Sequence, residues 1–202
     1  MNSALAAYLE SLYATGIAHD SAQPDRLLRH RNLEPESAQL LGMVIRMTRA
    51  REVVEIGTAN AYSTIWLADA VHDVDGHVTS VDTVAYADAR HNLATADSAS
   101  PGLLERVTLV QQDGGAFLSG LDDASVDLLF LDAERVEYTH WWPHPLRVIR
   151  AGGALVIDNV RSHPDEVAPF LALLAAESTT VVGMSVAVGK GVHLAWRKHP
   201  GA

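Results

Sequence analysis

The chain has 202 residues, with 15 lysines and arginines against 25 aspartates and glutamates, and no cysteine. Its formal net charge of -10 argues against a nucleic-acid scaffold, which needs clustered basic residues for phosphate contacts. The absence of cysteine excludes disulfides, thiolate catalysis and cysteine-ligated zinc.

The composition predicts a globular protein with one domain over residues 1–202. No stretch approaches the roughly 18–20 apolar residues that span a bilayer. The N-terminus lacks the basic region of a secretory signal, and Glu10 interrupts its apolar stretch. We therefore expect a soluble, cytoplasmic protein with no membrane or nucleic-acid partner.

The first 50 residues are predicted to form a helical extension. Residues 3–14 carry leucines and a tyrosine at helical spacing, which indicates an amphipathic helix. A short helix is expected near 25–31, and a third helix begins near Pro35, a residue suited to a first helical turn. Their apolar stripes need burial, so we expect the extension to cover the substrate side or to form a homodimer interface.

From residue 52 onward, short apolar runs alternate with helix-like segments. The predicted strands are Val53–Ile56, Val78–Val81, Val107–Val110, Val126–Leu131 and Ala154–Ile157, and the predicted helices lie at 62–72, 86–97, 114–120, 136–149 and 164–176. Such runs predict parallel strands that are covered on both faces. The tail, around Gly189-Lys190-Gly191, predicts an antiparallel hairpin. The fold class is therefore α/β, a doubly wound and mostly parallel sheet in residues 51–202.

The turn after the first strand is a candidate ligand site, because such sheets bind ligands at the carboxyl ends of their strands. Gly57 allows a sharp turn and a close approach to a ligand. Ser63 begins a helix, where it caps the helix or donates to an anionic group. A dinucleotide site would need a second glycine where Ala59 stands, so the turn disfavours a pyrophosphate.

Two further acids follow strand ends. Asp82 ends the second strand, where a carboxylate accepts hydrogen bonds from a ribose diol. Asp113, followed by Gly114, comes after the third strand, where it accepts from an adenine amino group. The alternative is that each acid caps a turn or a helix. Three features at successive strand ends favour a nucleoside site.

Asp132 ends the fourth strand, and Asp158-Asn159 end the fifth. Since neighbouring parallel strands end at one edge of the sheet, these oxygen donors are predicted to hold Mg²⁺ or another divalent cation. Such an ion lowers the pKa of a substrate hydroxyl and positions it for attack. The alternative is that Asp132 caps a helix and Asp158-Asn159 form a turn.

These segments together resemble the catechol and caffeoyl-CoA type of class I, S-adenosylmethionine-dependent O-methyltransferases. The resemblance covers about residues 31–196 and is carried by Glu55-Ile56-Gly57-Thr58, Tyr62-Ser63, and Asp132 with Asp158-Asn159-Val160. It implies a Rossmann-like, seven-stranded methyltransferase sheet and methyl transfer to a small phenolic or catechol-like hydroxyl. It also implies that S-adenosylmethionine contacts Glu55, Gly57, Ser63, Asp82, Asp113 and Gly114; Thr58 and Asp132 are further candidates. Ala61 stands where the family usually has glycine.

The sequence leaves open which group accepts the proton of the substrate hydroxyl. The family commonly has a lysine three residues after Asp132, but Arg135 stands there, and arginine does not give up its proton at any working pH. We keep Arg135 as a candidate catalytic residue that neutralises a phenolate or binds a carboxylated substrate. Neither Lys190 nor Lys198 replaces the missing lysine on sequence grounds, and His140, His144 and His163 are weaker candidates.

Two other functions remain open. The chain is alternatively a methyltransferase for a carboxylate or an amine, or a cofactor-binding module without catalysis. The spacing of His140 and His144 resembles a zinc motif, but Pro143 and Pro145 disturb the helix it requires. The intact trio of oxygen donors favours the catalytic alternative.

Overall fold

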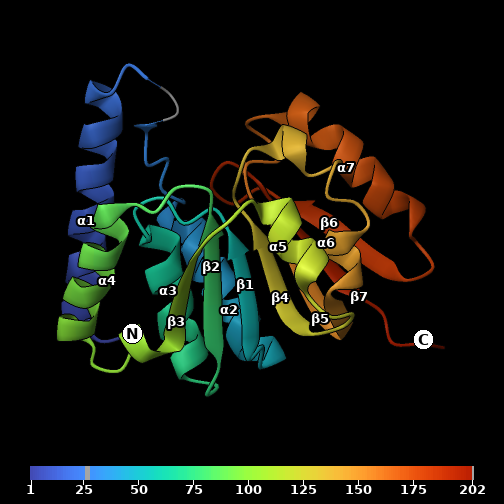
Figure 1. Cartoon of the computed structure of the whole chain (residues 1–202), viewed down its shortest axis with the longest axis horizontal. Helices are drawn as coiled ribbons and strands as arrows, with labels where there is room; N and C mark the ends of the chain where they lie inside the picture. The colour runs from blue at the N-terminus through green and yellow to red at the C-terminus, as the bar shows by residue number, and fades with distance from the viewer. Residues whose placement is uncertain (26–27, 202) are drawn as a thin grey trace.

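The computed structural model describes residues 1–25 and 28–201 and has a seven-stranded sheet at its centre (Figure 1). The strands are β1 (Glu52–Ile56), β2 (His77–Asp82), β3 (Val107–Gln111), β4 (Val126–Leu131), β5 (Ile149–Ile157), β6 (Val181–Val186) and β7 (Val192–Arg197). Their order is β3-β2-β1-β4-β5-β7-β6. The first five strands pair in parallel, whereas β7 runs antiparallel to β5 and β6. The predicted α/β sheet and its C-terminal hairpin are confirmed.

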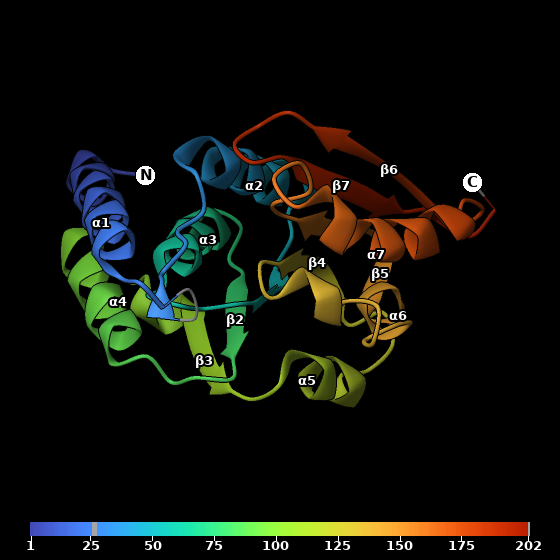
Figure 2. The ribbon, with the colours of Figure 1, turned by 90° about the horizontal axis from the view of Figure 1, so that it is seen from above.

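Helices cover both faces of this sheet (Figure 2). The α-helices are α1 (Ser3–Ala22), α2 (Pro35–Thr48), α3 (Tyr62–His72), α4 (Ala87–Ala99), α5 (Gly114–Gly120), α6 (His144–Arg147) and α7 (Pro164–Ala176), and the short 3-10 turns are η2 (Leu104–Arg106) and η3 (Arg135–Glu137). In both views α1 lies beside α4, and the hydroxyl of Tyr8 bonds Asn92 across that contact at 3.1 Å. The N-terminal helices therefore pack onto the helices of the sheet.

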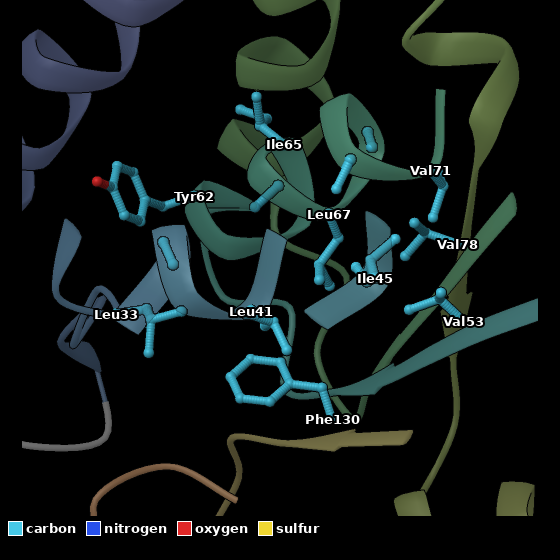
Figure 3. Close-up of a cluster of buried hydrophobic side chains, with 14 of the residues drawn as sticks. Leu33, Leu41, Ile45, Val53, Tyr62, Ile65, Leu67, Val71, Val78 and Phe130 are labelled. Carbon is cyan, nitrogen blue, oxygen red and sulfur yellow. The ribbon is translucent and has the colours of Figure 1, made fainter. Parts of the chain in front are cut away.

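Alternation along the strands divides the core into two layers. Val53 and Phe130 point to the face covered by α2 and α3, where they join Leu41, Ile45 and other apolar side chains (Figure 3). Their chain neighbours Val54 and Leu129 point to the opposite face of the sheet, where they belong to the same buried cluster as Phe170 of α7. Because successive side chains of a strand alternate between faces, a strand buried on both sides must be apolar throughout.

Two predicted helices differ markedly from the structure, and a third falls partly on residues that the structure does not describe. The predicted helix at 136–149 is wrong: only η3 and the four-residue α6 form there, because Pro143 and Pro145 cannot supply the N–H groups of a continuous helix. Helix α1 runs on to Ala22, beyond the predicted end at residue 14. The predicted short helix near 25–31 includes residues 26 and 27, which lie outside the described residues.

The topology brings distant segments to one edge of the sheet. The parallel strands β1, β2 and β4 end there, and so does β5. Since Ile157 at the end of β5 pairs with His193 near the start of β7, the loop before β7 lies at the same edge. Among the described residues, no helix has the length and apolar character needed to cross a bilayer.

Candidate active site

A cavity of about 600 Å³ opens at the carboxyl ends of β1, β2 and β4. Its walls include the turn after β1, the ends of β2 and β4, the start of α5, and the segment 29–33 that precedes α2. This last segment crosses from the α1 side of the molecule towards α2 (Figure 1). The N-terminal extension therefore covers the edge at which ligands bind in sheets of this kind.

The turn after β1 is a tight backbone loop that approaches β4. Gly57 has φ +111°, and a Cβ at this position would lie 2.2 Å from the carbonyl oxygen of Asp132. Only glycine fits here, because the conformation is left-handed and there is no room for a side chain. Ala61, where the family usually has glycine, also has a left-handed φ of 66° and begins α3 without a side-chain cap.

Asp82 fixes this turn from the neighbouring strand. One carboxylate oxygen accepts from the backbone N–H of Thr58 at 2.9 Å and of Ala59 at 3.1 Å, and the other accepts from Val84 at 3.1 Å. Asp82 also lines the cavity, and a carboxylate has room for a further acceptor contact. Its side chain therefore both shapes the turn and faces the ligand space.

Glu55 lies behind the turn and does not line the cavity. It is fully buried, and its oxygens accept from the hydroxyls of Ser63 at 2.5 Å, Thr64 at 2.5 Å and Ser80 at 2.6 Å. Thr58, which does line the cavity, shares a hydrogen bond of 2.7 Å with Ser80. Ser63 donates its hydroxyl to Glu55 and lines the cavity, so Ser63 lies between Glu55 and the cavity.

Burial raises the pKa of Glu55 from its ordinary 4.5 to about 7, although the three hydroxyls lower it. The folded protein therefore holds this proton more tightly than the unfolded chain does. The resulting stability is full below pH 4.5 and is lost as the pH rises through about 7.

Glu55→Gln should remove this pH dependence. In urea unfolding between pH 5 and 8, wild type is expected to lose up to ~3 kcal/mol more stability than the variant. Glu10→Gln, on the exposed side of α1, is the control and should follow wild type. Parallel curves for wild type and Glu55→Gln would show that Glu55 is ionised throughout this range.

Asp113 begins α5 and does not line the cavity. Its carboxylate caps the helix by accepting from the N–H of Ala116 at 2.8 Å, which is the capping alternative for this residue. Gly114 does line the cavity, and a Cβ there would lie 2.5 Å from Ile56 and 3.1 Å from the ring of Trp141. The glycine therefore lets the Trp141 ring pack at the wall of the cavity.

Asp132 and Asp158 end neighbouring strands, and their charges interact. Burial raises the pKa of both carboxyls, and the charge of Asp132 raises that of Asp158 further. Asp158 is 2% exposed, and its Oδ1 is buried without a hydrogen-bond partner among the described residues. Asn159 follows with a left-handed φ of 65° and lines the cavity together with Asp132. A buried carboxyl with an unpartnered oxygen, next to the half-buried carboxyl of Asp132, forms a site that favours a cation.

Arg135 and Tyr138 hold the segment after Asp132. Arg135 is buried, and its guanidinium donates to Glu166 at 2.8 and 2.9 Å. The hydroxyl of Tyr138 accepts from the N–H of Ala133 at 2.9 Å and donates to its carbonyl at 3.0 Å. Arg135 lines the cavity as a fixed cation, so it is placed to attract an anion and not to accept a proton.

Lys190 also lines this cavity, although sequence reasoning gave it no role. It lies in the loop before β7, and its ammonium pairs with Glu34 at 2.5 Å. Its charge lowers the pKa of both Asp132 and Asp158. The signal that could have identified it is the predicted hairpin itself: a strand antiparallel to β5 brings its preceding loop to the carboxyl edge.

A family model for O-methyltransferases matches residues 6–169, most of the chain. The chain belongs to the O-methyltransferase family. The catechol O-methyltransferase of Mycobacterium tuberculosis is 30% identical over 153 residues, which cover 74% of this chain and 64% of that protein. The O-methyltransferase TomG of Streptomyces achromogenes, solved with S-adenosylmethionine and involved in tomaymycin synthesis, is 26% identical with a TM-score of 0.75, covering 98% of this chain and 91% of TomG.

The matched segment spans only part of the curated relatives' length, between 54% and 57% for four mycobacterial proteins. The family model establishes the O-methyltransferase family, and the solved relatives support the Rossmann-like fold. Structural similarity over nearly the whole chain supports the sheet order and the antiparallel hairpin.

This member of the family brings most of its candidate site residues to one cavity. The candidate residues that line the cavity are Gly57, Thr58, Ser63, Asp82, Gly114, Asp132, Arg135 and Asn159. Asp158 lies next to Asn159 in the chain, directly beside the cavity, whereas Glu55 and Asp113 do not line it. Of the three histidines, His163 lines the cavity, whereas His140 and His144 are not among its lining residues. Since α6 begins only at His144, the helix that a zinc motif would need is not formed.

Proposed function

We propose that the chain transfers the methyl group of S-adenosylmethionine to a hydroxyl of a small phenolic or catechol-like acceptor. The observation that carries this proposal is the single cavity at which the turn after β1 meets Asp132 and Asn159. The cofactor of TomG and the substrate name of the mycobacterial catechol O-methyltransferase support it. The expected cytoplasmic location and homodimer stay predictions.

The cofactor is proposed to lie along the ends of β1 and β2. Gly57 and the uncapped start of α3 offer close backbone contacts to the methionine part, where the helix dipole favours its carboxylate. Asp82 accepts from the ribose hydroxyls, and Gly114 with Trp141 provides a flat wall for the adenine. Glu55 acts indirectly, by holding Ser63 in place.

Asp132, Asp158 and Asn159 are proposed to hold a divalent cation, preferably Mg²⁺. Their oxygen atoms suit a hard cation, and the unpartnered Oδ1 of Asp158 fits one. When bound, such a cation lowers the pKa of an acceptor hydroxyl. Tyr138 keeps this edge in position through its two bonds to Ala133.

The reaction balances without a further reactant. The acceptor oxygen attacks the methyl carbon as the carbon–sulfur bond breaks, the electron pair stays on sulfur, and the hydroxyl proton leaves to solvent or to a base. A sulfonium becomes a neutral thioether, S-adenosylhomocysteine. The residues of the cavity contribute positioning and charge stabilisation.

The test is formation of S-adenosylhomocysteine with catechol as the acceptor. We expect turnover with Mg²⁺, a fall of at least about 100-fold after exhaustive chelation, and recovery when Mg²⁺ is restored. Full turnover in excess chelator would reject the metal part of the proposal. No S-adenosylhomocysteine with any hydroxylated acceptor would reject the acceptor class.

A second candidate keeps the cofactor and changes the acceptor to a carboxylate or an amine. The Arg135 guanidinium lines the cavity and favours the carboxylate, and the family's usual lysine is missing at this position. Arg135→Lys that gains catechol activity would indicate that this chain has diverged towards another acceptor.

A further inference from the structure

A second cavity, of about 350 Å³, adjoins the first. The walls of the two cavities share Asp20, Arg29, Arg31, Asn32 and Lys190, and α1 lies on the far side of the second one. Since Lys190 also lies within electrostatic reach of Asp132, the second cavity begins beside the proposed transfer site. It is therefore placed to receive the part of an acceptor that points away from the reacting hydroxyl.

The charged side chains that line this second cavity are mainly cationic. Arg29, Arg31 and Lys190 line it in a chain whose overall charge is -10. The carboxylate that also lines it, Asp20, already accepts from the backbone N–H groups of His30 at 2.7 Å and Arg31 at 2.8 Å. Three cationic side chains around so small a space favour an anionic group of a ligand.

The cavity also has an unpartnered polar group and an aromatic wall. Both amide atoms of Asn32 are buried without a hydrogen-bond partner among the described residues, a costly state that a ligand can relieve. Tyr13 lines this cavity, and its ring lies 5.5 Å from that of Tyr62, which lines the first. An aromatic ring that extends from one cavity to the other would meet these two tyrosines.

We propose that the second cavity binds the acceptor and selects a phenol that carries a carboxylate, with Lys190 as the specificity-determining cation. This inference rests on the proposed function, and it names the acceptor class within it. Lys190 is held for this role by Glu34, and its main chain is held by bonds from Arg161 and Ser162 to its carbonyl. The ammonium therefore has a fixed position between the two cavities.

The test compares two acceptors that differ only in the carboxylate, catechol and 3,4-dihydroxybenzoate. In wild type, kcat/KM should be at least about tenfold higher for 3,4-dihydroxybenzoate. Lys190→Met should reduce this ratio about tenfold, and Lys190→Arg should keep it within about threefold. Lys198→Met is the matched control, because Lys198 bonds the carbonyl of Ser178, outside the residues that line either cavity, and it should leave the ratio unchanged.

The alternative is that these cations only hold the chain in place, through Lys190–Glu34 and Arg31–Glu134. Lys190→Met would then lower both kcat/KM values equally, and an unchanged ratio overturns the inference. A wild-type ratio of the two kcat/KM values near one also overturns the inference.

If neither acceptor is methylated, calorimetry on the protein loaded with S-adenosylhomocysteine measures whether the second cavity still prefers the carboxylated compound. Binding of 3,4-dihydroxybenzoate that exceeds that of catechol and weakens in Lys190→Met supports the inference while the proposed function fails. Equal binding of the two compounds overturns the inference.

Discussion

Gly57→Ala is expected to remove cofactor binding and to destabilise the protein. The new methyl group would lie 2.2 Å from the carbonyl oxygen of Asp132, and the residue would keep a left-handed φ of +111°. The left-handed conformation costs about 1–2 kcal/mol for alanine. Crowding of a packed site costs typically ~1–3 kcal/mol more. Urea unfolding should therefore show a loss of at least ~2 kcal/mol, and calorimetry should show S-adenosylhomocysteine binding at least about 100-fold weaker.

Gly120→Ala is the matched control for this substitution. A Cβ at Gly120 meets nothing within 4 Å, and the residue lies in α5 without a left-handed φ. Its stability should equal or slightly exceed that of wild type, since alanine is a better helix former. A Gly57→Ala protein that matches Gly120→Ala in both stability and binding would show that the turn after β1 can move away from β4 at little cost.

Asp132→Asn is expected to stop catalysis while the cofactor still binds. The substitution keeps the size of the side chain and removes the charge that we propose to hold the cation. We expect kcat/KM for a phenolic acceptor to fall roughly 10²–10³-fold, as when a group that stabilises the transition state is lost. Calorimetric affinity for S-adenosylhomocysteine should change less than about threefold.

Stability separates this loss of activity from misfolding. Because burial and the charge of Glu34 raise the pKa of Asp132, the asparagine variant should be at least as stable as wild type near pH 7. Asp123→Asn, at a side chain that is 79% exposed and pairs with Arg147, should leave turnover unchanged. Undiminished turnover in Asp132→Asn would remove this carboxylate from the proposed chemistry.

The sheet could be predicted because its strands have a simple physical signature. Leu128–Leu131 is apolar throughout and Val53–Ile56 is apolar except for Glu55, which is typical of strands buried on both faces. Their ends then follow directly, so Gly57, Asp82 and Asp132 could be placed at one edge from the sequence. The failed helix at 136–149 shows the limit: its apolar spacing was helical, but the prolines at 143 and 145 prevail over that spacing.

The side chains that act from neighbouring elements were harder to place. The family resemblance implies that Glu55 contacts the cofactor, yet Thr64 and Ser80, from elements packed around it, donate hydrogen bonds to its buried carboxylate. Such partners depend on packing between elements that are distant in sequence, and no local pattern records them. Asp113 forms the helix cap that was the alternative to its predicted adenine contact, and capping could be anticipated because it is decided within three residues.

The position of Lys190 could be predicted only in part. Its hairpin was predicted, and the pairing of β7 with β5 decides that the loop reaches the carboxyl edge. The missing step was the pairing partner of β7, which the sequence does not specify. Glu34, on the segment before α2, then completes an ion pair between residues 156 positions apart.

Crystals grown with S-adenosylhomocysteine, Mn²⁺ and catechol test the central claim most directly, through anomalous scattering at the manganese edge. We expect one strong peak bonded to oxygens of Asp132, Asp158 and Asn159, with the cofactor sulfur at the end of β1 facing the bound hydroxyl. His19, Asp20 and His30 also lie close enough together to share an ion. A peak at that cluster with none at Asp132, or a cofactor bound away from the turn at Gly57, would overturn the proposed metal site or the proposed cofactor site.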